Sequence, residues 1–130
     1  MSDTESIILS VSGYELQKDE VEFFRNTNPL GFVLFKRNFK NKKQLVYLTN
    51  SLKQITQNKG LLIFIDQEGG KVQRLDNDEF IKFPPQKLFG DIYEKDAKLA
   101  LDLAYKSSFL MGNQQKAVGI DVDFSPVCDL

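Results

Sequence analysis

The sequence contains no histidine, and this absence excludes several kinds of active site. Without an imidazole, the 130 residues cannot form a Ser-His-Asp triad, a Cys-His dyad or a zinc site with histidine ligands. Cysteine is almost absent as well, because Cys128 stands alone and no disulfide can form within the chain. A single cysteine is typical of a reducing compartment, so we expect a cytoplasmic protein.

Long apolar runs and an excess of positive charge are also missing. The apolar run Ile7–Leu9 is too short for the core of a signal peptide, and no stretch approaches the roughly 20 apolar residues of a membrane span. With 17 basic and 18 acidic side chains, the net charge is -1. A chain without a basic surface releases few counterions when it meets nucleic acid, so it gains little binding free energy from them. We therefore expect neither a membrane nor a nucleic-acid partner.

Four short apolar runs predict β-strands, at Ile7–Val11, Gly31–Phe35, Leu61–Ile65 and Val122–Val127. The second and third runs are almost continuously apolar, which is typical of strands buried on both faces of a parallel sheet. Apolar residues spaced by three and four predict helices between them: a short one ending before Pro29, one over Asn41–Gln57 capped by Asn41, and one over Asp91–Ala117. Residues 77–90, with a Pro-Pro pair, predict an irregular insertion.

The alternation of strands and helices predicts an α/β fold with a parallel sheet and right-handed crossovers. Two architectures fit this order: a doubly wound sheet, or the N-terminal half, about four βα units, of a TIM (β/α)8 barrel. In both architectures, ligands bind at the carboxyl ends of the strands. The side chains that follow each predicted strand are therefore the candidates for a functional site.

The segment after the third predicted strand, residues 66–75, places many polar side chains at such a strand end. Asp66 could accept hydrogen bonds from vicinal hydroxyls, and Arg74 could donate to the same hydroxyls. The pair Gly69-Gly70 would let the backbone turn tightly and approach a ligand closely. The alternative interpretation is a surface turn whose charges are solvated.

Two further clusters have simpler interpretations. Lys36 and Arg37 follow the second strand and could bind a phosphate, although a solvated helix start with one or two structural contacts is favoured. Asp121, Asp123 and Asp129 surround the fourth strand and raise the possibility of a metal. Because Asp121 and Asp123 share one face of that strand and need not converge with Asp129, we predict no metal site. Cys128 is expected to be a small buried residue.

Residues 65–75 closely resemble the Asp-Gln-Glu-Gly-Gly-Arg-Val-Gln-Arg segment of bacterial β-N-acetylglucosaminidases in glycoside hydrolase family 3. Residues 11–16, 31–39 and 119–130 resemble other segments in the family's order, so the resemblance covers nearly the whole chain. It implies a TIM barrel of eight strands, for which about 250 residues are typical. Residues 1–130 would then be the N-terminal part of a single barrel domain, truncated at its C-terminal end.

The resemblance also implies a function. The family's enzymes are retaining exo-β-N-acetylglucosaminidases that need no metal or organic cofactor, and many act on peptidoglycan fragments in cell-wall recycling. The substrate would be a saccharide or muropeptide that contains N-acetylglucosamine. Asp66 would hold the outer hydroxyls of the non-reducing sugar, and Arg74 would assist it. Lys71 stands where the family usually has Arg, so the charge is kept and the planar fork is lost.

The family's catalytic groups have no counterpart in these residues. Its Lys-His-Phe-Pro-Gly-His-Gly segment, its acid/base histidine and its late-strand aspartate nucleophile are all missing, so we assign no catalytic residue and expect the chain alone to be inactive. One alternative is a non-catalytic half barrel that binds sugar or pairs with a second chain. Another is a doubly wound domain that binds an anion near Lys36 and Arg37. The oligomeric state is not predicted.

Overall fold

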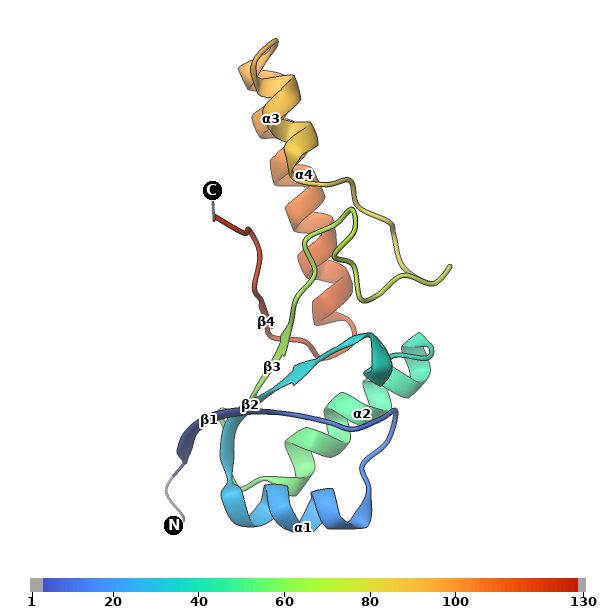
Figure 1. The fold of residues 1–130 in the computed structure, drawn as a ribbon, viewed down its shortest axis with the longest axis vertical. Helices are drawn as coiled ribbons and strands as arrows, with labels where there is room; N and C mark the ends of the chain where they lie inside the picture. The colour runs from blue at the N-terminus through green and yellow to red at the C-terminus, as the bar shows by residue number, and fades with distance from the viewer. Residues whose placement is uncertain (1–3, 129–130) are drawn as a thin grey trace.

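A four-stranded parallel sheet organises the computed structural model, which describes residues 4–128 (Figure 1). The strands are β1 (Glu5–Ser10), β2 (Pro29–Leu34), β3 (Leu62–Ile65) and β4 (Val122–Asp123). They pair in the order β1-β2-β3-β4, and every pair is parallel. All four overlap the predicted runs.

The fourth strand is shorter than predicted, because it ends at Asp123 and not at Val127. The amide of Phe124 makes the last contact with the third strand, to the carbonyl of Ile65 at 2.9 Å. Since β3 itself ends at Ile65 and Pro126 has no amide hydrogen, the ladder cannot continue. Cys128, which the sequence predicts to be buried, is exposed beyond this strand.

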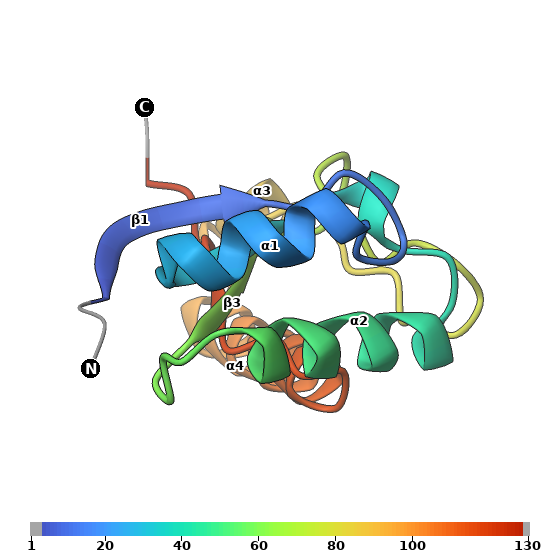
Figure 2. The same cartoon turned by 90° about the horizontal axis from the view of Figure 1, so that it is seen from below.

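The helices are α1 (Lys18–Thr27), α2 (Lys42–Ile55), α3 (Lys87–Tyr93) and α4 (Ala97–Lys116), with a short 3-10 turn η1 at Lys36–Asn38. The first helix ends before Pro29, as predicted, with Asn28 in the left-handed conformation at φ 47°. Asn41 caps the second helix as predicted, because its side chain accepts from the amide of Gln44 at 2.9 Å. Helices α1 and α2 lie side by side (Figure 2).

The prediction of one helix over Asp91–Ala117 is wrong, because two helices occupy this region. Asp96 interrupts the chain with an extended backbone, and its carboxylate caps α4 by accepting from the amide of Leu99 at 2.9 Å. The preceding helix begins at Lys87, inside the segment predicted to be irregular. The two helices pack against each other and extend away from β1 and β2 (Figure 1).

The strand order distinguishes the two candidate architectures. A doubly wound sheet reverses its strand order at a switch point, which places helices on both faces. Here each connection moves the chain one strand further in the same direction. With the right-handed crossovers that are the rule for parallel strands, this order places the helices on one face, as in a TIM barrel. The predicted N-terminal half of a barrel is therefore confirmed, and the doubly wound alternative is wrong.

An apolar core between the helices and the sheet holds these elements in place. The predicted stripe of α2 faces it, with Leu45, Leu48 and Leu52 almost fully buried. Phe24 of α1 packs edge-on against Phe32 of β2, with ring centroids 4.7 Å apart. Within the part of the chain that the structure describes, no helix is both long and apolar enough to span a bilayer.

Candidate functional site

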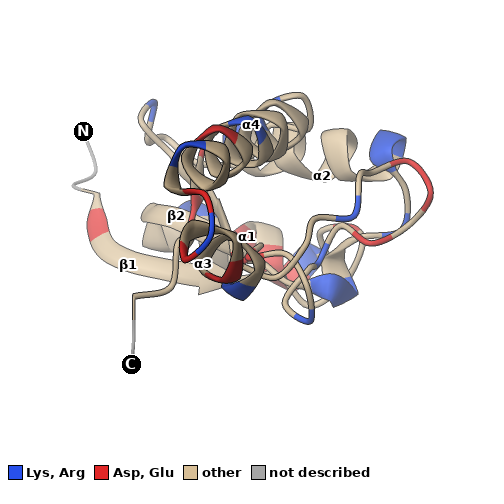
Figure 3. Ribbon diagram, turned by 90° about the horizontal axis from the view of Figure 1, so that it is seen from above, with Lys and Arg blue, Asp and Glu red and all other residues tan. Residues whose placement is uncertain are grey.

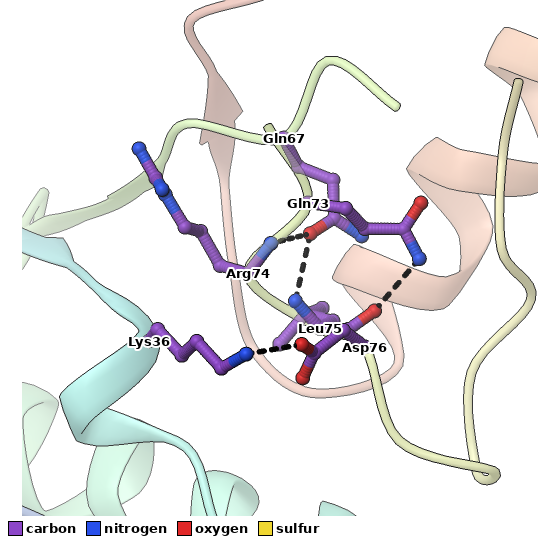
Figure 4. Close-up of polar contacts among 6 residues, drawn as sticks. All are labelled: Lys36, Gln67, Gln73, Arg74, Leu75 and Asp76. Carbon is purple, nitrogen blue, oxygen red and sulfur yellow. Dashed lines mark hydrogen bonds and ion pairs between the residues drawn. The ribbon is translucent and has the colours of Figure 1, made fainter. Parts of the chain in front are cut away.

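The loop after β3 is organised by one buried amide side chain, that of Gln67. This residue has no exposed surface, and its Oε1 accepts from the backbone amides of Arg74 and Leu75, each at 2.9 Å (Figure 4). Both hydrogen bonds return the chain to the strand end, because Arg74 and Leu75 lie seven and eight residues after Gln67. Gln67 therefore brings Arg74 back beside Asp66.

The glycine pair fits a tight turn, as predicted, but the close approach is to the protein itself. Gly69 and Gly70 have φ values of 86° and 61°, in the region that disfavours a side chain. A Cβ on Gly69 would lie 2.4 Å from the carbonyl oxygen of Pro84, and one on Gly70 would lie 2.8 Å from Cβ of Pro85. The glycines thus allow the segment around Pro84-Pro85 to pack on the loop.

A second glutamine fixes this packing. The side chain of Gln73 donates to the carbonyls of Leu75 and Ile81, at 3.1 and 3.2 Å, and accepts from the amide of Phe83 at 2.9 Å. It joins the loop after β3 to the irregular segment that precedes α3. Sequence reasoning gave Gln73 no role beyond its place in the motif.

Asp66 and Arg74, the two predicted substrate-binding residues, form an ion pair at the end of β3. Nη2 of Arg74 lies 2.6 Å from Oδ2 of Asp66, and the two side chains are 30% and 28% exposed. Nε of Arg74 is buried and has no hydrogen-bond partner among residues 4–128. Where a carboxylate lies beside a guanidinium, the carboxylate can accept from one hydroxyl while the guanidinium donates to the neighbouring one, which suits a vicinal diol.

Asp123 joins this network from β4. Its Oδ1 accepts from the backbone amide of Gln67 at 3.0 Å, and its Oδ2 accepts from the side chain of Gln115 in α4. Burial raises the pKa of Asp123 above its ordinary value of 3.8. The hydrogen bonds from Gln115 and Gln67 oppose this rise, and the negative charge of Asp66 adds to it.

The acidic residues around β4 that the structure describes do not converge on a metal site. Asp121 accepts from the amide of Ile63 at 2.9 Å and pairs with Lys53 at 3.0 Å, so it is engaged away from Asp123. Asp129 lies outside the described residues. Within residues 4–128, no three side chains of the Asp, Glu, Cys or His types gather closely enough to hold a metal ion.

The basic cluster after β2 makes structural contacts. Lys36 pairs with Asp76 in the loop after β3 (Figure 4), and Nε of Arg37 donates to the carbonyl of Val11 at 3.1 Å. The Arg37 guanidinium also lies over the ring of Phe35, 4.6 Å from its centroid. Near the start of α2, basic and acidic segments of the ribbon occur together (Figure 3). These contacts agree with the structural interpretation and leave an anion site without support.

A cavity of about 470 Å³ lies between the α3–α4 hairpin and the ends of β3 and β4. Asp123, Glu68 and Gln115 contribute polar groups to its wall, while Met111 and Phe89 contribute apolar surface. Neither Asp66 nor Arg74 lines it. The ion pair is therefore presented outside this cavity, and Asp123 stands between the two.

The fold and the site together define a class: a parallel β/α half barrel whose polar site lies at the carboxyl end of its third strand. Residues 4–130 match the family model described as the glycosyl hydrolase family 3 N terminal domain. The chain belongs to glycoside hydrolase family 3, and the predicted resemblance is confirmed.

Individual relatives agree with this membership. A β-hexosaminidase of Xylella fastidiosa is 38% identical over 124 residues, which cover 95% of this chain and 36% of the relative. NagZ from Neisseria gonorrhoeae, solved in complex with zinc ion, superposes with a TM-score of 0.90 at 32% identity, covering 96% of this chain and 37% of that one. The same protein in complex with N-trifluoroacetyl-D-glucosamine gives a TM-score of 0.86 at 31% identity, over 92% and 34%. The chain therefore spans about a third of the length of these relatives.

Proposed function

We propose that this chain supplies the sugar-binding part of a retaining exo-β-N-acetylglucosaminidase, a glycoside hydrolase that releases terminal N-acetylglucosamine. The observation that carries the proposal is the ion pair of Asp66 and Arg74 at the carboxyl end of β3, where barrels of this type bind their ligands. Relatives named β-hexosaminidase, and a relative solved with N-trifluoroacetyl-D-glucosamine, support the reaction and the sugar.

In this proposal, Asp66 and Arg74 bind the sugar and do not react with it. Each side chain is about 30% exposed, so both are accessible from solvent. The Asp66 carboxylate accepts from one hydroxyl of the non-reducing sugar, and Arg74 donates to the next. A retaining glycosidase also needs a nucleophile and an acid/base about 5 Å apart. We assign neither role to the described residues.

The natural substrate proposed is a peptidoglycan fragment that ends in N-acetylglucosamine, and the compartment proposed is the cytoplasm. The single cysteine suits a reducing compartment. Activity on purified muropeptides, compared with activity on chitin oligosaccharides, tests the substrate. Cell fractionation with an antibody against the chain tests the compartment.

The reaction is tested with the protein expressed from its own gene, assayed on 4-nitrophenyl β-N-acetylglucosaminide and on the matching β-glucoside. We expect release from the first substrate only. We expect Asp66→Asn to lower kcat/KM by about tenfold to a hundredfold, as for a lost charged hydrogen bond. Asp76→Asn, which removes the ion pair to the largely exposed Lys36, is the matched control and should keep its activity. No release by the wild type, or an equal loss in both variants, would contradict the proposal.

A second candidate function is a non-catalytic half barrel that pairs with another chain. The outer side of α4 favours it, because Leu101, Tyr105 and Phe109 follow one another at intervals of four residues and are 64%, 70% and 59% exposed. Sedimentation velocity discriminates between the two functions. A dimer that Tyr105→Glu dissociates would favour assembly, whereas a monomer that binds N-acetylglucosamine would favour the glycosidase.

A further inference from the structure

Asp123 links three elements of the fold through one carboxylate. It is the last residue of β4, its Oδ1 accepts from the amide of Gln67 just after β3, and its Oδ2 accepts from Gln115 in α4. The pairing of β3 with β4 does not need these bonds, because the amide of Phe124 already donates to Ile65. The carboxylate therefore constrains the start of the loop and not the sheet.

Gln67 transmits this constraint to both members of the ion pair. Asp66 precedes Gln67 directly, so the amide that Asp123 accepts from belongs to the peptide unit joining Asp66 to Gln67. Arg74 is held from the other side, because its own amide donates to Oε1 of Gln67 at 2.9 Å. Both binding residues thus take their backbone position from the same fully buried glutamine.

We propose that Asp123 is a positioning residue for the sugar-binding pair, acting through Gln67 to fix the separation and direction of Asp66 and Arg74. Asp123 does not touch the sugar in this account. It sets the orientation of the peptide from which the Asp66 side chain leaves the strand. The inference rests on the proposed function and adds a residue to its binding machinery.

The donors and acceptors around Asp123 define a rescue experiment. In Asp123→Asn, the remaining oxygen still accepts from Gln67, but the other oxygen is replaced by an amide NH2 group that faces the NH2 group of Gln115. Two donors then oppose each other in a partly buried place. Adding Gln115→Glu supplies an acceptor for the new donor, restores both hydrogen bonds and returns the net charge to its original value.

Asp121, which lies just before the same strand begins, provides a matched control. Its carboxylate also accepts from a backbone amide of β3, that of Ile63 at 2.9 Å, and it also contacts a helix, through Lys53 of α2. Its hydrogen bonds and its ion pair go to β3 and α2 and not to the loop that carries Arg74. Asp121→Asn therefore reports what a comparable structural defect does to the molecule when the loop keeps its support.

The experiment measures two quantities on the intact chain and its variants. The first is the dissociation constant for N-acetylglucosamine, from an NMR titration. The second is the hydrogen-exchange rate of the Arg74 and Leu75 amides relative to amides of α2. We expect Asp123→Asn to weaken sugar binding by about tenfold and to accelerate exchange at both loop amides by a similar factor. The double variant with Gln115→Glu should recover both values, and Asp121→Asn should change neither.

Three results would overturn the inference: wild-type values of both quantities in Asp123→Asn, no recovery in the double variant, or equal losses in Asp121→Asn. If Asp123→Asn does not fold, Asp123→Ser gives the same comparison. Serine has a shorter side chain, so its oxygen lies further from Gln67, and it places no NH2 group against Gln115. Failure of the proposed function is distinguishable, because the wild type would then not bind the sugar. The exchange rates of Arg74 and Leu75 need no sugar and would still decide whether Asp123 holds the loop.

Discussion

The loops after β2 and β3 occupy equivalent places in the fold and are built alike, yet only the second is proposed as a binding site. Each follows a buried strand, each carries cations, and each is organised by an amide side chain without exposed surface, Asn38 in one and Gln67 in the other. Position at a strand end and the type of residue are therefore shared. The difference lies in how much of the hydrogen-bonding capacity the protein itself uses.

In the loop after β2, both donors of the buried amide side chain have partners. Asn38 donates to the carbonyls of Val11 and Gly13, at 2.9 and 2.8 Å, and accepts from the amide of Phe35 at 2.9 Å. Its neighbour Arg37 is bound to the same Val11 carbonyl. These contacts tie β1 to β2, so this loop serves the sheet.

In the loop after β3, part of the hydrogen-bonding capacity is unused. Gln67 accepts two hydrogen bonds, but its Nε2 has no partner within the described part of the chain. Arg74 makes one side-chain bond, to Asp66, and both side chains keep about 30% of their surface. We infer that a strand end can serve as a binding site where the backbone positions charged groups but leaves part of their hydrogen-bonding capacity unused. The following predictions test this contrast.

The largest effect is expected at Asn38, in the structural loop. Asn38→Ala removes three hydrogen bonds, to the carbonyls of Val11 and Gly13 and from the amide of Phe35, and Arg37 still donates to Val11. We expect a loss of about 3 kcal/mol in the free energy of unfolding. Urea denaturation measures it. Asn41→Ala, which removes only the cap of α2, is the control and should cost about 1 kcal/mol. A smaller loss at Asn38 than at Asn41 would contradict the account of the loop after β2.

The next largest effect is expected at Gly69, in the binding loop. Gly69→Ala forces a side chain onto a backbone at φ 86° and against the Pro84 carbonyl, and we expect a loss of about 2 kcal/mol together with weaker sugar binding. The control is Gly112→Ala in α4, where a new Cβ meets nothing within 4 Å. That change should stabilise the protein by about 0.5–1 kcal/mol, because alanine favours the helix. Equal effects at the two glycines in urea denaturation would contradict the packing described for the loop.

A small effect is expected where the two loops meet, at the ion pair of Lys36 and Asp76. The Lys36 side chain is 69% exposed, so Lys36→Ala should lower the free energy of unfolding by no more than about 0.5 kcal/mol. Salt should reduce the difference further. A loss above 1 kcal/mol in urea denaturation, unchanged by salt, would mean that the two loops depend on each other more than the contrast allows.

The pH dependence of Asp123 refines the contrast further. Because its folded-state pKa is raised, the folded protein binds more protons than the unfolded one between pH 3.8 and that raised pKa. The contribution of Asp123 therefore favours the folded state at low pH and declines as the pH rises through this window. The stability of the wild type relative to Asp123→Asn should fall accordingly in urea denaturation across the acid range. A rise over the same range would contradict the burial of this carboxylate.

Sequence reasoning could identify the parts of this structure that depend on neighbouring residues. Strand positions, the cap at Asn41 and the nearness of Asp66 to Arg74 all follow from local patterns or one contiguous motif. The break at Asp96 was missed, because apolar spacing continues through it and only the capping geometry reveals it. Asp123 was considered for a metal and not for the loop. Its contact with Gln67 spans 56 residues and depends on how β4 aligns with β3, which no local pattern encodes.

The most direct test of the central claim is a titration of N-acetylglucosamine followed through the Nε–H resonance of Arg74, in the wild type, Asp66→Asn and Asp76→Asn. The account predicts that the sugar shifts this resonance in the wild type and in Asp76→Asn with equal affinity. In Asp66→Asn, it predicts binding at least about tenfold weaker. An unshifted Arg74 resonance in the wild type, or equal affinity in Asp66→Asn, would contradict the assignment of this ion pair as the sugar-binding site.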